Sequence, residues 1–186
     1  NIKAAEAGKA KIEILLSESV KRKKLSEEEK IRLLKKVKTD ASLENISSSD
    51  LVIEAVFEDL NLKHNLYKKI EPHLKEGAIL ASNTSTLPIT KLSEVLADSR
   101  RFLGIHFFSP VDKMNLVELI KSERTNDTAL AVALDYTSLI KKTPIVVNDS
   151  RGFYANRCII PYINEGLRML NEGIEPALIE NSAKQI

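Results

Sequence analysis

The sequence is poor in the residues that build several common kinds of site. Among 186 residues it has one cysteine, Cys158, and no tryptophan. A single cysteine excludes an internal disulfide and a cysteine-based zinc site, and it fits a reducing compartment. We expect Cys158 to be a small buried apolar side chain. No cluster of metal-ligating residue types is evident, so we expect no metal site.

Long apolar runs and a strong charge of one sign are also missing. Runs such as Ala78–Ala81 and Ile145–Val147 are far shorter than the roughly 20 residues that span a bilayer, so we expect no membrane span. The formal net charge is only +2, and no basic block is interleaved with aromatic residues. Nucleic acid is therefore not an expected partner. With 43% hydrophobic and 29% charged residues, the composition is that of an ordinary globular protein.

The residues that are present alternate between strand-like and helical patterns. Short runs rich in branched residues are separated by segments with helical periodicity, which predicts parallel strands joined by crossover helices in an open α/β sheet. After Ser150 the strand pattern stops and two helical segments follow, so we predict a sheet domain over 1–150 and a helical domain over 151–186. The predicted strands are 51–57, 78–82, 102–107 and 145–147, and the predicted helices are 4–20, a short one around 31–34, 61–74, 88–97, 125–142, 153–171 and 176 onward.

One histidine and one carboxylate stand out as a possible proton-transfer pair. His106 and Glu118 lie at the two ends of a strand-like apolar segment. Histidine changes charge near neutral pH, and a carboxylate on its second ring nitrogen fixes the tautomer and makes the first nitrogen more basic. The alternative is a core histidine satisfied by a backbone carbonyl, with Glu118 as a surface charge. Spacing alone does not decide between them.

Further polar residues follow the predicted strands. Glu58 comes after the first strand, the run Ser82–Thr86 after the second, and His106 closes the third. Ligands of an open parallel sheet bind beyond the carboxyl ends of its strands, so this recurrence favours a binding site there. Taken alone, the run Ser82–Thr86 is also typical of a capping turn.

Four motifs in order along the chain resemble the L-3-hydroxyacyl-CoA dehydrogenase family, and they span most of the sequence from Leu51 onward. The sequence after His106 is similar to that of the dehydrogenase part of multifunctional alpha subunits of fatty-acid oxidation complexes. The motifs are Ser82-Asn83-Thr84-Ser85-Thr86, Gly104-Ile105-His106-Phe107-Phe108-Ser109-Pro110-Val111, Leu116-Val117-Glu118 and Gly152-Phe153-Tyr154-Ala155-Asn156-Arg157.

The resemblance implies a Rossmann-type parallel sheet domain followed by an all-α C-terminal domain, and NAD-dependent oxidation of L-3-hydroxyacyl-CoA to 3-oxoacyl-CoA in fatty-acid β-oxidation. It implies that His106 is the general base and Glu118 its orienting partner, with Ser85 and Asn156 hydrogen-bonded to the substrate. It also places residues along the nicotinamide half of NAD, namely Ala55, Val56, Glu58, Lys63 and Asn83.

The sequence departs from the family pattern in two ways. Ser109 and Arg151 stand where the family often has asparagine and proline. No G-x-G-x-x-G turn occurs in the 186 residues, and the resemblance aligns Asn1 after the second strand of the family's sheet. We expect residues before Asn1 to supply this turn. A molecule without it should bind NAD weakly and associate through the open sheet edge beside 51–57.

Two other functions remain open from the sequence. A β-hydroxyacid dehydrogenase shares the two-domain plan, but it generally relies on a lysine of the helical domain. A non-catalytic assembly module would use the helices after Ser150 as an interface. The resemblance implies an acyl-CoA substrate, a homodimer or a subunit of a fatty-acid oxidation complex, and a bacterial-type cytoplasmic location, with mitochondria and peroxisomes left open.

Overall fold

The computed structural model describes residues 1–185, which fall into two compact units, Asn1–Ser48 and the chain from Ser49 onward. The first unit is a helical hairpin of α1 (Ile2–Lys21) and α2 (Glu27–Lys36), followed by the 3₁₀ turn η1 (Glu44–Ser48). Ser26 begins α2 with a capping box, in which its hydroxyl accepts from the Glu29 amide and the Glu29 carboxylate accepts from the Ser26 amide. Both predicted helices are confirmed.

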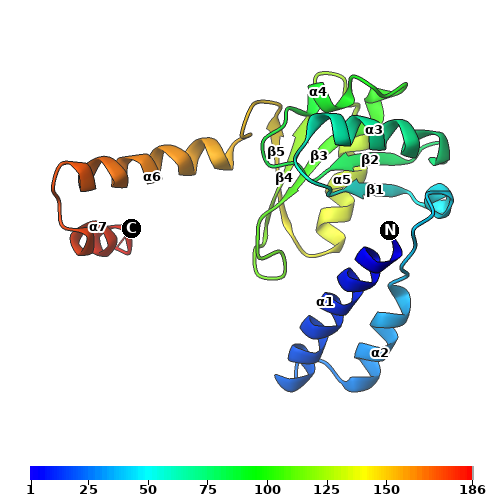
Figure 1. The fold of residues 1–186 in the computed structure, drawn as a ribbon, viewed down its shortest axis with the longest axis horizontal. Coiled ribbons are helices and arrows are strands. Elements are labelled where there is room, and N and C mark those ends of the chain that lie inside the picture. Colours follow the sequence, from blue (N-terminus) through cyan, green and yellow to red (C-terminus); the bar gives the residue numbers. More distant parts are fainter. Residues whose placement is uncertain (186) are drawn as a thin grey trace. The chain divides into compact units, whose positions relative to one another are not determined.

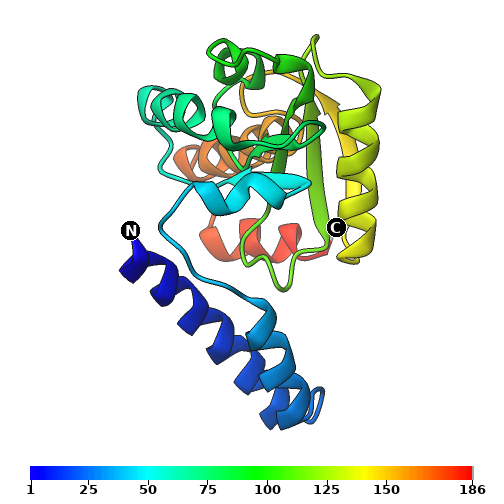
Figure 2. The same ribbon diagram turned by 90° about the vertical axis from the view of Figure 1, so that its right-hand side faces the viewer.

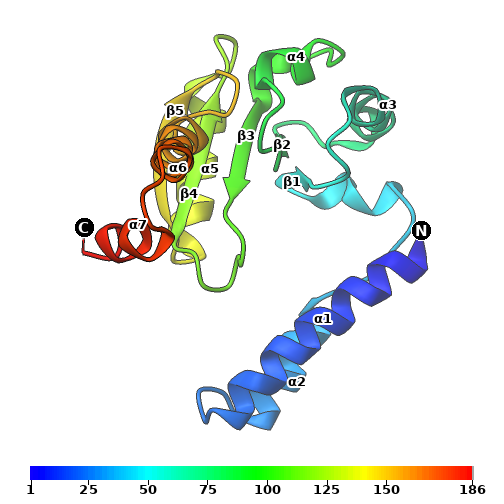
Figure 3. The same cartoon turned by 60° about the vertical axis from the view of Figure 1, so that its left-hand side comes forward.

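The second unit contains a five-stranded sheet whose spatial order equals the chain order, as Figure 3 shows. The strands β1, β2 and β3 are parallel, β4 is antiparallel to β3, and β5 is parallel to β4. The predicted α/β class is therefore confirmed. The bounds are β1 Leu51–Glu54, β2 Ile79–Ser82, β3 Phe102–Phe107, β4 Leu116–Lys121 and β5 Thr143–Asn148.

Two details of the predicted strands were wrong. His106 and Glu118 do not end one strand-like segment, because the chain reverses after Phe107 and returns as β4, a strand that was not predicted. The first strand stops at Glu54 and not at Phe57. Directly after the strand, the Val56 amide donates a hydrogen bond to the Glu54 carboxylate. The open edge of the sheet beside β1 is therefore shorter than expected.

Helices cover both faces of this sheet (Figures 1 and 2). One face packs against α5 (Asp127–Leu139), whose Ala129 and Ala133 are fully buried against strand residues such as Leu103 and Leu119. The other face packs against α3 (Leu60–Ile70) and α4 (Ile89–Ser93). Gly104 lets α4 approach, because a Cβ there would lie 2.8 Å from the Ile89 side chain.

The chain leaves β5 through a turn and continues as α6 (Ala155–Asn171) and α7 (Pro176–Ala183), as predicted. Cys158 on α6 is exposed, so its predicted burial was wrong. None of the residues of α6 is buried. Within residues 1–185, no helix is both long enough and apolar enough to cross a bilayer.

Candidate active site at the carboxyl ends of the strands

His106 and Glu118 face each other across the antiparallel strands β3 and β4. They are directly paired in the register of the sheet, a position that brings side chains on the same face within about 5 Å of each other. The His106 Nδ1 and Glu118 Oε2 atoms are 2.7 Å apart, and both residues are buried. The chain reversal between β3 and β4, which was not predicted from the sequence, therefore brings this pair together.

The other oxygen of Glu118 holds the start of α6. Glu118 Oε1 accepts hydrogen bonds from the amides of Tyr154, at 3.0 Å, and Ala155, at 2.8 Å. The turn before them contains Gly152 at φ 75° and Phe153 at φ 50°, and such a φ is uncommon for a residue with a side chain. The carboxylate is thus placed at the positive end of the α6 dipole.

These contacts keep Glu118 ionised. Burial raises the pKa of Glu118, but the hydrogen bonds from His106 and from the amides of Ala155 and Tyr154 outweigh it and leave the pKa below its usual range. An anionic Glu118 accepts a hydrogen bond from Nδ1–H of His106, which places the lone pair of the neutral ring on Nε2.

Aromatic rings surround the histidine. The centroid of its ring lies 4.7 Å from that of Phe108 and 5.9 Å from that of Phe153. Over the described residues, His106 Nε2 has no hydrogen-bond partner. The ring is therefore held by Nδ1 and by packing, while Nε2 is left to take a proton from a ligand.

Ser85 and Asn156 also meet, although they are 71 positions apart. The Asn156 Nδ2 atom donates to the Ser85 carbonyl oxygen over 3.1 Å. Asn156 follows Ala155, whose amide binds Glu118, so one turn of α6 is tied both to the histidine pair and to the loop after β2. The Ser85 hydroxyl makes no hydrogen bond within residues 1–185, and Ser85 is exposed.

Glu58 organises the loop that carries Ser85. Its Oε1 accepts from the Ser85 and Thr86 amides, both at 3.0 Å, and from the hydroxyls of Thr84 and Thr86. Burial raises the pKa of Glu58, but the Thr84 hydroxyl, the two amides and the charge of Lys63 lower it to about 2. The run Ser82–Thr86 is thus a turn held from outside by an ionised carboxylate.

Lys63 is fully buried and lies between two carboxylates. Its Nζ is 2.8 Å from Glu54 Oε1 and 3.4 Å from Glu58 Oε2. Glu54 and its partner Tyr67 were not singled out from the sequence, and Ser82 was named only as part of a motif; the hydroxyls of Tyr67 and Ser82 donate to Glu54 Oε2. The signal that could have found Glu54 is a charged residue inside an apolar strand.

The remaining predicted cofactor residues lie at the same edge of the sheet. Ala55 and Val56 are exposed directly after β1. Asn83 follows β2, and its Oδ1 accepts from the Phe107 amide at 2.9 Å. Asp149, another residue that sequence reasoning missed, accepts from the Ile89 and Thr90 amides and so ties the end of β5 to the start of α4.

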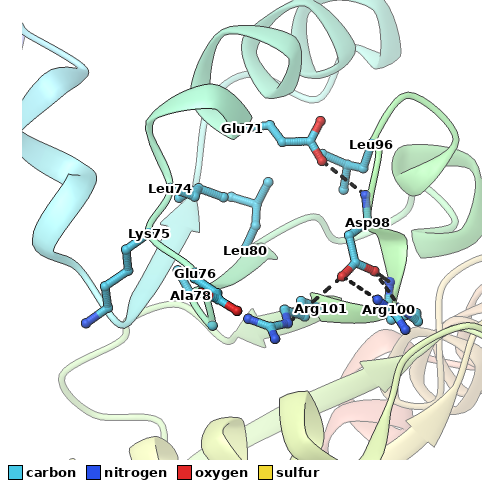
Figure 4. Close-up of a pocket in the computed structure, with 11 residues that line it drawn as sticks. Glu71, Leu74, Lys75, Glu76, Ala78, Leu80, Leu96, Asp98, Arg100 and Arg101 are labelled. Carbon is cyan, nitrogen blue, oxygen red and sulfur yellow. Dashed lines mark hydrogen bonds and ion pairs between the residues drawn. The ribbon is translucent and has the colours of Figure 1, made fainter.

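A hollow of about 350 Å³ lies at the amino ends of β2 and β3 (Figure 4). Two ion pairs of its lining residues are exposed to solvent, Arg100 with Asp98 and Lys75 with Asp50, the residue before β1. No group of three or more metal-ligating side chains is found in residues 1–185. The buried charges are thus concentrated at the carboxyl ends.

Comparisons with known proteins agree on one family. Residues 1–150 match the family model described as "3-hydroxyacyl-CoA dehydrogenase, NAD binding domain", and residues 152–186 match "3-hydroxyacyl-CoA dehydrogenase, C-terminal domain". The fatty acid oxidation complex subunit alpha of Shewanella amazonensis is 42% identical over 159 residues, which are 86% of this chain and 22% of the relative. The chain thus spans about a fifth of the length of that curated relative.

Solved structures of the same family resemble this fold. The (S)-3-hydroxybutyryl-CoA dehydrogenase of Ralstonia eutropha is 39% identical with a TM-score of 0.90, over 94% of this chain and 62% of that one. The dehydrogenase part of multifunctional enzyme 1 from C. elegans is 32% identical with a TM-score of 0.68, over 77% of this chain and 33% of that one. The chain therefore belongs to the 3-hydroxyacyl-CoA dehydrogenase family, and its sheet is part of that family's NAD-binding domain.

Proposed function

We propose that this chain carries the proton-transfer site of an NAD-dependent enzyme that oxidises L-3-hydroxyacyl-CoA to 3-oxoacyl-CoA in fatty-acid β-oxidation. The observation that supports it most is the buried His106 and Glu118 pair, with Nδ1 held at 2.7 Å and Nε2 unpartnered within the described chain. Such a pair is suited to removing a hydroxyl proton near neutral pH.

Four residues of this chain have separate roles in the proposed reaction. His106 Nε2 takes the proton of the substrate's 3-hydroxyl, and the ionised Glu118 stabilises the imidazolium that forms. The free hydroxyl of Ser85 and the amide of Asn156 orient the hydroxyl or thioester oxygen. NAD bound at the end of β1 would supply the acceptor for the hydride from C3 of the acyl chain.

The residues at the end of β1 fit the nicotinamide half of this cofactor. Glu58 is ionised and 36% exposed, and among residues 1–185 only Lys63 approaches its Oε2, so this oxygen can accept hydrogen bonds from ribose hydroxyls. Ala55 and Val56 expose backbone and small side chains beside it. Asn83 and Lys63 complete the proposed set, Lys63 from its buried position behind Glu58.

The proposal extends to the domain boundary and to the partners of the protein. A boundary at about residue 150 places the sheet in a domain over 1–150 and starts the helical domain at 151. We propose that the protein works as a homodimer or as the alpha subunit of a fatty-acid oxidation complex in a bacterial cytoplasm, in line with the relative from Shewanella.

The test is NADH formation by the full-length natural protein with L-3-hydroxybutyryl-CoA, D-3-hydroxybutyryl-CoA and free 3-hydroxybutyrate. We expect turnover with the L-thioester alone. Turnover with the free acid would favour a β-hydroxyacid dehydrogenase instead. No turnover with any of the three would favour an assembly module.

A further inference from the structure

Glu54 is a buried carboxylate at the end of β1 that takes no part in the proposed proton transfer. It is 4% exposed, and each of its oxygens accepts two hydrogen bonds. Oε1 accepts from the Val56 amide at 2.7 Å and from Lys63 Nζ at 2.8 Å. Oε2 accepts from the Tyr67 hydroxyl at 2.6 Å and from the Ser82 hydroxyl at 2.8 Å. The carboxylate is therefore fixed from four sides.

A buried ion pair of this kind is a weak source of stability. Taking both charges out of water costs about as much as their attraction returns, and apolar residues of similar volume often do as well. Stability alone therefore gives little reason for Glu54 and Lys63. What an apolar pair could not do is present a fixed positive charge to a third group.

Glu58 is that third group. Lys63 Nζ reaches Glu58 Oε2 at 3.4 Å while it stays bound to Glu54. The opposite oxygen of Glu58 holds the amides of Ser85 and Thr86. A continuous set of contacts thus runs from Glu54 through Lys63 and Glu58 to the backbone of Ser85, whose carbonyl in turn accepts from Asn156.

We propose that Glu54 is a positioning residue: through Lys63 and Glu58 it fixes the turn that carries Ser85. Removing its charge leaves Glu58 as the sole carboxylate within 4 Å of the Lys63 ammonium among the described residues. Lys63 then shifts toward Glu58, and Glu58 can no longer hold its position against the Ser85 and Thr86 amides. The catalytic consequence rests on the proposed function, whereas the ordering of the turn does not.

The first arm measures hydrogen exchange of the Ser85 and Thr86 amides in the ligand-free full-length protein. Glu54→Gln keeps the side-chain shape and removes the charge, and loss of a charge-assisted hydrogen bond is expected to raise exchange of the turn about tenfold. Tyr67→Phe is the matched control, because it removes a hydrogen bond to the same carboxylate on the oxygen that does not face Lys63. Its turn should exchange as in the wild type.

The variant with both Glu54→Gln and Lys63→Gln guards against misfolding. It contains no unpaired buried charge, so it is expected to fold even if Glu54→Gln alone does not. Its turn should still exchange faster than that of the wild type, because Glu58 has lost its cation. Wild-type protection of the turn in this double variant would overturn the proposal, and so would equal exchange in Glu54→Gln and Tyr67→Phe.

The second arm measures kcat and KM with L-3-hydroxybutyryl-CoA. A displaced Ser85 acts on the reacting geometry, so Glu54→Gln should lower kcat about tenfold with little change in KM. An equal loss of kcat in Tyr67→Phe would mean that Glu54 acts through stability alone, and would overturn the proposal. A wild-type protein without turnover would refute the proposed function but leave the exchange result to decide the role of Glu54.

Discussion

The two ends of the sheet use the same kinds of residue in opposite ways. At the carboxyl ends of β1, β2 and β3, the side chains of Glu54, Lys63 and Glu118 are fully buried, and each is held by several partners. At the amino ends, the paired side chains of Asp98 and Arg100 are 39% and 71% exposed (Figure 4). An acid beside a base is therefore no sign of function by itself. Burial with complete hydrogen bonding separates the two ends.

The physical reason lies in the field around each pair. Solvent and salt screen a charge at the amino ends, where it can rotate away from its partner. A charge at the carboxyl ends has a fixed position in a medium of lower dielectric constant, so its effect on a neighbouring group persists. Variants at the two ends of the sheet test that contrast.

The largest effect is expected from His106→Gln. Loss of a general base costs on the order of a hundredfold to ten-thousandfold in rate, so kcat for NADH formation should fall by that factor while acyl-CoA binding stays nearly intact. His73→Gln makes the same chemical change near the amino ends of the strands and should leave the rate unchanged. Turnover of His106→Gln near that of the wild type would refute the assignment of the base.

A smaller loss is expected from Glu118→Gln. The variant keeps the shape but weakens the support of the imidazolium, and such partners typically contribute about tenfold to a hundredfold. The side-chain amide of glutamine also replaces the carboxylate that accepts hydrogen bonds from the backbone amides of Tyr154 and Ala155. The melting temperature should therefore fall as well. Steady-state kinetics and calorimetry on one preparation check both effects. A variant that melts lower but turns over like the wild type would confine Glu118 to a structural role.

At acid pH, the melting temperature of Glu58→Gln should depend on pH less than that of the wild type. The pKa of Glu58 is about 2 in the folded protein against an ordinary value of 4.5, so the unfolded chain takes up the proton first as the pH falls. The stability that this carboxylate contributes is complete above pH 4.5 and is lost between 4.5 and 2. Melting temperatures measured over this range should fall more steeply for the wild type than for Glu58→Gln. Parallel curves would show that the turn does not depend on the charge.

The smallest effect is expected from Arg100→Ala at the amino ends. Its ion pair with Asp98 is exposed and screened, so neither the melting temperature nor kcat should change measurably. If this variant lost activity, the contrast between the two ends of the sheet would fail.

Much of the fold could be predicted from the sequence because local patterns carry it. The branched run after Asp50 forms β1, although it is shorter than predicted, and the helical spacing from Thr125 to Lys142 forms α5. The reversal between Phe107 and Leu116 could not be predicted, because β4 has no helix before it and its partner is chosen by tertiary packing. The predicted sheet consequently lacked the strand that carries Glu118.

The candidate site was predicted where a motif covered it and missed where contacts are long-range. Ser85 and Asn156 were named from motifs, and the structure brings them into contact. Their roles, and those of the predicted cofactor residues, stay predictions. Glu54 and Asp149 were missed because their partners lie up to 60 positions away, beyond any local pattern.

The most direct test of the account combines His106→Gln and Glu118→Gln in one protein and compares kcat of the single and double variants. If the two residues form one proton-transfer unit, removing the second partner after the first should cost little, and the double variant should be about as slow as His106→Gln. If the two losses multiply instead, His106 and Glu118 act independently and the account is contradicted.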